Sequence, residues 1–388
     1  MYTSFGIHTF TLFITVVEHE AFTIIADFKK YNTMTGEILI IKDKEYPSNY
    51  AIEYRGGRGI RWRIKYSHEW HGIPIYCIEA RLNPKVLSSG VPDYFNVANY
   101  QEIKVALDKF DTEAKKISDK LETLSSYKIN RIDYCINFDI KELGIDCTVE
   151  EMTALLKRGN IPHHFKEWMK YDKKSHRMVS DIAAFYLISK SVVLNCYQKG
   201  EQLQREYPQT PKIPNDIIRF EIQCKYNKIF NMKKGRLLSN AETMNFLLSD
   251  EHSRDVITSY YNRIILGGDY YSLADAARKI QSYSFSTKKE ERLIGVLKYI
   301  AVCRGIAKAK DKLHGDGIIV FSQALRELVE LGINPVTIPR EWGIKQTKNL
   351  LDSVNDVSQS RDTDNHMKLK NSNIMEYYNS DNIALIAN

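Results

Sequence analysis

The sequence predicts an α+β fold, with a central antiparallel sheet that carries helices on one face and a mainly α-helical C-terminal domain after it. Two features lead to this prediction. From Phe10 to about Lys225, short segments rich in β-branched and aromatic residues are separated by turn sequences, which is the pattern of strands. After about Phe230, apolar residues recur at helical spacing. A chain of 388 residues is also long enough for two domains, each with its own core.

We therefore divide the chain into three parts. Residues 1–230 form the predicted sheet domain and residues 231–355 the helical domain, whereas residues 356–388 form a flexible tail because the sequence there is polar. Within the sheet domain, Gln101 to Ser126 has the spacing of one amphipathic helix, and Arg55-Gly-Gly-Arg-Gly59 predicts a hairpin turn that touches DNA backbone. The later predicted helices span residues 241–248, 256–265, 272–282, 288–304 and 322–331.

The composition narrows the class of protein. A formal charge of +7 suits a polyanionic partner, although many proteins that never bind nucleic acid share it. The six cysteines form no CxxC pair, which argues against a zinc ribbon or a disulfide framework. Neither a Walker-type loop nor a Rossmann fingerprint occurs, so we do not expect ATP or NAD as a ligand. Because no apolar run could span a bilayer and no signal peptide is recognisable, we expect a soluble, cytoplasmic protein without a membrane partner.

Four segments alternate so that one face would be apolar and the other polar, because successive side chains of a strand point to opposite faces. The segments are residues 129–140, 217–226, 75–83 and 191–199. Their polar faces carry Arg131, Asp133, Cys135 and Asn137; Arg219, Glu221, Gln223 and Lys225; Glu79, Arg81 and Asn83; and Asn195, Tyr197 and Lys199.

These four strands, if they share one sheet, place carboxylates, cations and a tyrosine in one shallow cleft. Such a set suits the cutting of a phosphodiester, because carboxylates hold Mg²⁺ or Mn²⁺ and the metal stabilises the charge of the transition state. A phenol needs a nearby cation or metal to become a nucleophile, and Lys199 follows Tyr197 by two residues. The alternative is a solvated sheet face on which the charged residues form only screened ion pairs.

Three segments carry a resemblance to a known family. They are Asn130-Arg-Ile-Asp-Tyr-Cys-Ile-Asn137, Asn195-Cys-Tyr-Gln-Lys-Gly-Glu201 and Ile218-Arg-Phe-Glu-Ile-Gln-Cys-Lys225. In this order they resemble the RxD strand, the YxKxxE segment and the RxE strand of rolling-circle replication initiators from plasmids and phages of Gram-positive bacteria, and of related nickases of conjugative elements. The stretch from Gly235-Arg-Leu-Leu238 to Gly267-Gly-Asp-Tyr-Tyr271 is similar to clostridial-type members.

The resemblance implies a nicking endonuclease domain with an antiparallel sheet of the HUH-like Rep type. In this family a tyrosine attacks a phosphodiester at a hairpin origin, which leaves a 5′-phosphotyrosine and a free 3′-hydroxyl. Carried over by motif position, Asp133 and Glu221 would hold Mg²⁺ or Mn²⁺. Arg219 would clamp a phosphate or a carboxylate, and Lys199 would be the cation near the tyrosine.

Tyr197 is the candidate nucleophile by motif position, and a purely structural role for it stays equally open among the 24 tyrosines. Tyr260 and Tyr261 are the next candidates, because some members of the wider superfamily place the nucleophile on a helix after the sheet.

The sequence departs from the family pattern because no His-hydrophobic-His strand is present to supply imidazole ligands. His163 and His164 are adjacent and would point to opposite faces of a strand. His68 and His71 have the spacing of a turn, which is more often filler than a metal pair. We therefore expect the metal to be held by carboxylates.

Thr337 to Leu351 resembles the turn and second helix of a helix-turn-helix, with one helix ending at Gly343 and the next running from Ile344 to Leu351. Side chains on that second helix could read bases or bind phosphates. A capping pair of helices is an equally good interpretation. The predicted DNA-binding residues are Arg131 and Lys225 in the sheet and Lys345, Gln346 and Lys348 on this helix.

The leading hypothesis is thus a replication initiator that binds and nicks an origin. The resemblance implies as partners double-stranded origin DNA with a hairpin, single-stranded DNA, and host helicase and polymerase, and it leaves a homodimer open. A conjugative relaxase would use the same chemistry on another DNA site. An alternative of a different class is a non-catalytic DNA-binding initiator or regulator, in which the carboxylates only brace the sheet. That alternative predicts DNA binding without metal-dependent cleavage.

Overall fold

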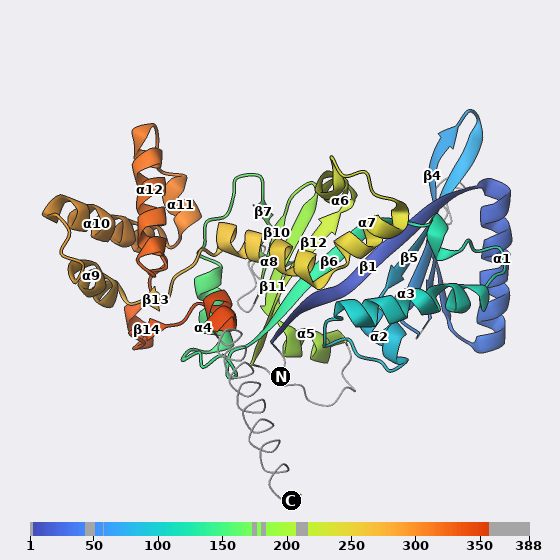
Figure 1. The fold of residues 1–388 in the computed structure, drawn as a ribbon, viewed down its shortest axis with the longest axis horizontal. Helices are drawn as coiled ribbons and strands as arrows, with labels where there is room; N and C mark the ends of the chain where they lie inside the picture. The colour runs from blue at the N-terminus through green and yellow to red at the C-terminus, as the bar shows by residue number, and fades with distance from the viewer. Residues whose placement is uncertain are drawn as a thin grey trace, which may run out of the picture. The chain divides into compact units, whose positions relative to one another are not determined.

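The computed structural model describes residues 3–42, 51–56, 58–172, 177–179, 184–206 and 216–356 (Figure 1). It has an α+β fold with a large antiparallel sheet, as the sequence predicts. Within the described residues the chain forms two compact units. The first lies within Met1–Asp139 and Thr148–Ile264, and the second lies within Ile140–Cys147 and Ile265–Asn388.

The first unit extends beyond the predicted boundary at residue 230, because the next helices pack on its sheet. The Tyr134 hydroxyl donates a hydrogen bond to the Leu247 carbonyl at 2.9 Å. The ring of Tyr261 lies 5.9 Å from that of Phe138 and 5.4 Å from that of Phe220, measured between centroids. These contacts bury part of the apolar face of the sheet, so the helices between residues 240 and 264 are part of this unit.

Ten of the described strands form one sheet in the order β2-β3-β4-β5-β1-β6-β12-β11-β10-β7, and every pair of neighbours is antiparallel. Short pairs join β8 with β9 and β13 with β14. The bounds are β1 (Ser4–Val17), β2 (Ile38–Lys42), β3 (Ala51–Arg55), β4 (Ile60–Trp70), β5 (Ile73–Leu82), β6 (Lys128–Asp139), β7 (Lys166–Glu167), β8 (Lys170–Asp172), β9 (Arg177–Val179), β10 (Ala184–Ile188), β11 (Val192–Gln198), β12 (Ile217–Lys225), β13 (Tyr270–Tyr271) and β14 (Gln346–Thr347).

The four segments with a predicted polar face are β5, β6, β12 and β11, and all of them belong to this sheet. Their register confirms that the polar residues share a face. Glu221 lies opposite Cys135 and Asn195, and Arg219 lies opposite Asn137 and Tyr197. Strand β1, which the sequence analysis left out of the set, lies between β5 and β6.

Helices cover the apolar face of the sheet (Figure 1). Trp62 of β4 is buried between Phe28 of α1 and Phe110 of α3. Helix α3 begins after an Asn99 cap and ends at Lys115, earlier than predicted, because the Lys115 ammonium donates to backbone carbonyls of the turn that follows. The helices are α1 (Glu18–Thr35), α2 (Pro84–Ser89), α3 (Tyr100–Lys115), α4 (Val149–Leu156), α5 (Lys199–Glu206), α6 (Tyr226–Lys233), α7 (Asn240–Leu247), α8 (Asp250–Ile264), α9 (Leu273–Gln281), α10 (Thr287–Cys303), α11 (Ile306–Lys310) and α12 (Asp316–Glu330).

One end of the polar face is covered by the chain around residue 95 and by α5. Ile7 of β1 and Ala98 exchange two backbone hydrogen bonds, of 3.0 and 2.9 Å. The approach is close because Gly6 has no side chain, and a Cβ atom there would lie 2.5 Å from the Ala98 carbonyl oxygen. Phe95 is thereby held over the sheet, where it packs with Leu203 of α5.

Strands β3 and β4, on either side of the predicted hairpin turn, pair with each other, as a hairpin requires. Gly59 has φ +85°, and a Cβ atom there would lie 2.7 Å from the Leu87 backbone nitrogen. Both the backbone conformation and the close approach of α2 therefore require glycine.

The second unit is mainly helical, as predicted, with a core supplied by α9, α10 and α12. Ile280 of α9, Leu297 of α10 and Leu328 of α12 are buried in this core. Among the described residues of the whole chain, no helix combines the length and the apolar character that crossing a membrane would need.

The predicted helix-turn-helix is wrong. Residues 340–342 form a single 3-10 turn that ends at Gly343, and Gln346–Thr347 then form β14, which pairs with β13. The Gln346 amide donates to Asp269 and to the Tyr271 hydroxyl, both at 3.1 Å, so this side chain is engaged inside the unit. Lys345 and Lys348 are exposed, but they do not lie on a common recognition helix because the backbone there pairs with β13.

We expect the Gly6→Ala variant to lower the free energy of unfolding by roughly 1–3 kcal/mol, because the added methyl group overpacks against the Ala98 carbonyl. Urea unfolding followed by circular dichroism measures this change. The matched control is Gly295→Ala in α10, where a Cβ atom meets nothing within 4 Å and helix propensity should raise stability slightly. Equal stability of the Gly6→Ala variant and the wild type would show that this close approach is not tightly packed.

Candidate functional site

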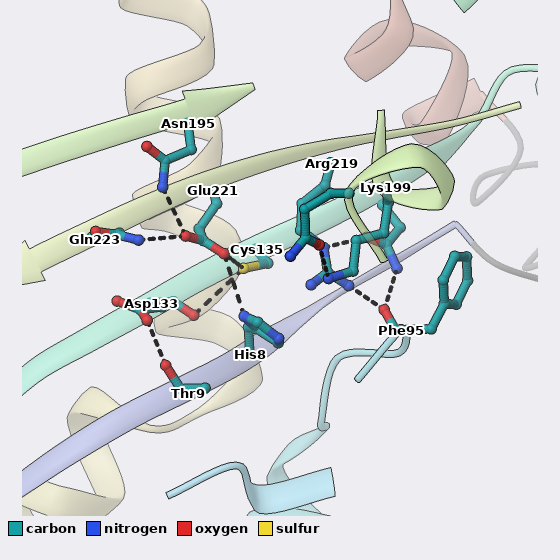
Figure 2. A network of polar contacts seen from close by, with 12 residues as sticks. His8, Thr9, Phe95, Asp133, Cys135, Asn195, Lys199, Arg219, Glu221 and Gln223 are labelled. Atoms are coloured by element: carbon teal, nitrogen blue, oxygen red, sulfur yellow. Dashed lines mark hydrogen bonds and ion pairs between the residues drawn. The ribbon is translucent and has the colours of Figure 1, made fainter. Parts of the chain in front are cut away.

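Glu221 of β12 lies at the centre of a buried polar cluster (Figure 2). Its Oε1 atom accepts hydrogen bonds from Asn195 at 2.9 Å and from Gln223 at 2.6 Å. Its Oε2 atom lies 3.4 Å from His8 Nδ1 and accepts from the Cys135 thiol at 3.3 Å. Burial by itself would raise the pKa of Glu221, but the His8 hydrogen bond and the nearby positive charge hold that pKa well below its ordinary value. Glu221 is therefore ionised.

His8 reaches this cluster through a β-bulge in β1. Ile7 pairs with Tyr134 and Thr9 pairs with Asp133, so His8 is the extra residue between two pairs. A bulge changes which face a side chain points to, and here it places both His8 and Thr9 on the polar face. Burial and then the charge of Arg219 lower the pKa of His8 to about 4, against the opposing effect of Glu221. His8 is thus a neutral imidazole at neutral pH.

Asp133 of β6 is completely buried beside this cluster and is held by cations. Arg131 donates to both of its carboxylate oxygens, at 2.7 and 3.0 Å, and Arg81 donates at 3.2 Å. The Thr9 hydroxyl adds a hydrogen bond of 2.5 Å. Both oxygens of Asp133 are therefore occupied by these partners, and its predicted metal-ligand role stays a prediction.

Arg219 of β12 is fully buried at the covered end of the polar face. Its Nε atom donates to Asn137 at 2.8 Å, and its Nη2 atom donates to the Phe95 carbonyl. Its Nη1 atom is buried without a hydrogen-bond partner among the described residues. A buried N–H donor without a partner is costly to stability.

Tyr197 of β11 lies opposite Arg219 and is 8% exposed. Burial, and then the charge of Glu221, raises the pKa of Tyr197 well above its ordinary value, so the phenol is protonated. Lys199, which alternation placed in the same strand, instead begins α5. Its ammonium donates to Gln202 at 2.7 Å and lies 5.9 Å from the centre of the Tyr197 ring. Lys199 thus lies near the ring of Tyr197, and the predicted role of this lysine in activating the tyrosine stays a prediction.

A cavity of about 310 Å³ adjoins the cluster. Its charged lining is mostly cationic, and it contains one tyrosine that the sequence analysis did not single out, the half-buried Tyr94. An anion the size of a phosphodiester would be attracted here. The lining residues are His8, Thr9, Arg55, Gly56, Gly59, Ile60, Arg61, Arg81, Asn83, Tyr94, Lys199, Gln202 and Leu203.

His8, Cys135 and Glu221 are the only described residues in which three metal-ligand atoms gather, all within 4.8 Å of one another. The set offers nitrogen, sulfur and oxygen, whereas Mg²⁺ prefers oxygen alone, so a transition-metal cation such as Mn²⁺ is more compatible with the imidazole nitrogen. Burial raises the pKa of the Cys135 thiol well above its ordinary value, which leaves His8 and Glu221 as the principal donors. Of the predicted carboxylate pair, Glu221 lies in this set and Asp133 does not.

The remaining candidate residues lie elsewhere. Tyr261 is in the core against the apolar face, so it cannot act at the polar cluster. Tyr260 lies on the same helix, α8, where burial raises its pKa to about 12. Arg131 and Lys225 lie opposite each other on the polar face.

The histidines that the sequence analysis considered as pairs do not join the cluster. Among the described residues, the His163 ring meets the His164 ring edge-on, His68 hydrogen-bonds with the neighbouring Ser67, and neither pair joins the set of metal-ligand atoms. The histidine that joins it, His8, lies at the bulge between Ile7 and Thr9 of β1, which puts His8 and Thr9 on the same face and interrupts the alternation of the strand. Tyr94 lies between α2 and α3, where the sequence has no alternation or motif that would have identified it as a site residue.

Comparison with protein-family models and with curated proteins gave no match. Among solved structures, the chain is similar to the di-domain aromatase/cyclase StfQ from the steffimycin biosynthetic pathway, at 9% identity over 64% of this chain and 93% of the other. The TM-score is 0.19, and no functional argument rests on this likeness.

Acid should destabilise the protein through His8. The folded-state pKa of about 4 lies below the ordinary value of 6.5, so the unfolded chain binds a proton that the folded chain does not, and stability falls as pH drops below 6.5. Between pH 6.5 and 5 we expect a loss of about 2 kcal/mol from this residue. Urea unfolding in EDTA should therefore show a flatter pH dependence for His8→Asn. An unchanged slope would mean that another group titrates in this range.

Proposed function

We propose that this protein is a rolling-circle replication initiator that nicks one strand of origin DNA with a tyrosine and keeps the 5′ end as a phosphotyrosine. The proposal includes the HUH-like Rep type for the antiparallel sheet, cytoplasmic action, and an origin with a hairpin as the substrate. Host helicase and polymerase are its proposed partners, because polymerase would extend the free 3′-hydroxyl. A relaxase of a conjugative element would use the same site on a different DNA.

One observation carries the proposal. The three sequence motifs reach adjacent strands, β6, β12 and β11, and the polar side chains that lie on these strands share a face, whereas Lys199 and Glu201 of the second motif lie in α5. Glu221, Arg219 and Tyr197 come from neighbouring positions of β12 and β11, and a cationic cavity adjoins them. A sheet face that served only to be solvated would not need to bury these groups.

The arrangement supports the following chemistry. A phosphodiester enters the cationic cavity, where Arg81 and Lys199 balance its charge. The phenol oxygen of a tyrosine attacks phosphorus, the bond from phosphorus to the 3′-oxygen breaks, and that oxygen takes up a proton to leave a 3′-hydroxyl. The phenol proton passes to solvent water, because His8 has a pKa of about 4 and is one of the two residues that would hold the divalent cation.

The nucleophile is proposed to be Tyr197 by its motif or Tyr94 by its place at the cavity. Tyr197 has the neighbouring cations, but it is buried, and its raised pKa keeps the hydroxyl protonated. Tyr94 is more exposed and lines the same cavity as His8. Substitution of each by phenylalanine distinguishes them, since phenylalanine removes only the hydroxyl.

His8 and Glu221 are the residues that would hold a divalent cation, which we propose to be Mn²⁺ in preference to Mg²⁺. When bound, such a cation would polarise the phosphoryl oxygen and stabilise the developing negative charge.

A second candidate function, a DNA-binding initiator or regulator without nuclease activity, is favoured by one specific observation. Both buried carboxylates are already fully paired, Asp133 with two arginines and Glu221 with four neighbours. In that case the polar cluster would brace the sheet and would cut nothing.

Nicking of supercoiled plasmid that carries the protein's own gene region tests the proposal. We expect open circles with covalently attached protein, and a loss of at least about 100-fold in rate for Glu221→Gln and for the phenylalanine variant of the true nucleophile. Tyr260→Phe is the matched control and should retain the wild-type rate. Absence of cleavage under all metal conditions, with DNA binding intact, would favour the non-catalytic candidate.

The metal preference gives a separate expectation. EDTA should abolish nicking, and Mn²⁺ should restore a higher rate than Mg²⁺ because a nitrogen donor lies beside Glu221. Rates at matched free concentrations of the two cations measure the difference. If Mg²⁺ supports the faster reaction, oxygen atoms alone hold the cation and His8 is not one of its ligands.

A further inference from the structure

A row of cations crosses the polar face of the sheet at one register position. Arg55 of β3 lies opposite Arg61 of β4, which lies opposite Arg81 of β5. Across β1, where Thr11 occupies the row, the next members are Arg131 of β6 and Lys225 of β12. We call Arg55, Arg61, Arg81, Arg131 and Lys225 the cation row. Because neighbouring strands are about 5 Å apart, the row runs roughly 24 Å across the strands.

Like charges directly opposite each other destabilise a sheet, so the row needs a compensating feature. Buried carboxylates provide it. Glu53 pairs with Arg55 and Arg61 and its side chain is 4% exposed, whereas these arginines are 48% and 41% exposed. Asp133 pairs in the same way with Arg81 and Arg131, which are 36% and 30% exposed. The carboxylates lie at the base and the cations above them, so the face presented to solvent is positive.

The row is continuous with the cavity of the candidate site. Arg61 and Arg81 line that cavity, and they also line a second hollow of about 370 Å³. The second hollow contains Arg63, Lys65 and Arg131 as well, and its two carboxylates, Glu53 and Glu79, are each paired with a cation. A chain of phosphates could therefore follow the row and bring one phosphate to His8 without leaving the positive surface.

Exposed aromatic rings flank the far end of the row. Tyr226, next to Lys225, is 46% exposed and Phe230 is 50% exposed. Their rings are stacked with centroids 6.5 Å apart, and Phe13 of β1 meets Tyr226 edge-on at 6.0 Å. Proteins that hold single-stranded nucleic acid combine a cationic track for the backbone with aromatic rings on which bases stack.

We propose that the cation row is the binding track for single-stranded DNA, which crosses the strands of the sheet and leads into the candidate site. A single file of cations matches one phosphate backbone, and the rings at its end match unpaired bases rather than a closed duplex. The choice of DNA as the polyanion rests on the proposed function. The track itself follows from the register, the exposed arginines and the aromatic rings.

The test is the salt dependence of binding of fluorescent oligothymidylate to the full-length protein in EDTA, so that nicking cannot contribute. The variant Arg61→Gln/Arg81→Gln leaves each buried carboxylate one arginine partner, Arg55 or Arg131, which protects the fold. Each lost phosphate contact reduces the slope of log affinity against log salt by about 0.7, so we expect a reduction of about 1.4. The control Lys30→Gln, on an exposed position of α1, should keep the wild-type slope.

The charge-preserving variant Arg61→Lys/Arg81→Lys should retain most of the slope, which separates lost charge from a damaged fold. Tyr226→Ala should weaken oligothymidylate binding roughly tenfold and leave an abasic strand of the same length unaffected. An unchanged slope in the glutamine variant overturns the track, and so does equally tight binding of duplex DNA or of anionic lipid vesicles. If the slope falls as expected but the protein does not nick DNA, the track is supported and only the proposed chemistry is refuted.

Discussion

Two buried carboxylates, Asp133 and Glu221, impose the constraint on which the polar face of the sheet depends. An ionised carboxylate out of contact with water is tolerated only when charges and hydrogen bonds compensate it. For Asp133 the compensation is two arginines and a threonine hydroxyl, and for Glu221 it is two amides, a thiol and an imidazole. These requirements fix side chains from β1, β5, β6, β11 and β12 in one arrangement, which joins the candidate site to the surface beside it.

The two carboxylates have different consequences. Asp133, together with Glu53 nearer the edge of the sheet, forms ion pairs with arginines whose side chains remain partly exposed to solvent. Glu221 instead orients a neutral imidazole and lies next to the fully buried Arg219, whose Nη1 atom lacks a partner among the described residues. One half of the face thus presents positive charge to solvent, and the other half holds a neutral imidazole near a buried guanidinium. Under the proposed function, DNA would bind on the first half and react beside the second.

The sequence was sufficient for the features that follow from alternation and periodicity. The polar sets of β5, β6, β11 and β12 were predicted and share a face, because period-two alternation survives wherever the strand is regular. His8 could not be predicted, since a one-residue bulge between Ile7 and Thr9 reverses the phase of β1 at that point. The helix predicted from Ile344 to Leu351 failed because pairing with β13 overrides local propensity. The boundary near residue 230 was placed too early, since periodicity identifies a helix but not the surface on which it packs.

We propose that a tyrosine on this face of the sheet forms a covalent bond to DNA. The most direct measurement uses an oligonucleotide whose scissile 3′-oxygen is replaced by sulfur, so that the cleaved strand cannot be rejoined, followed by peptide mapping of the trapped adduct by mass spectrometry. We expect one modified tyrosine, Tyr197 or Tyr94, and loss of the adduct in the His8→Asn variant. An adduct on Tyr260 or on a tyrosine of the second unit, or no adduct on a strand that binds, would contradict it.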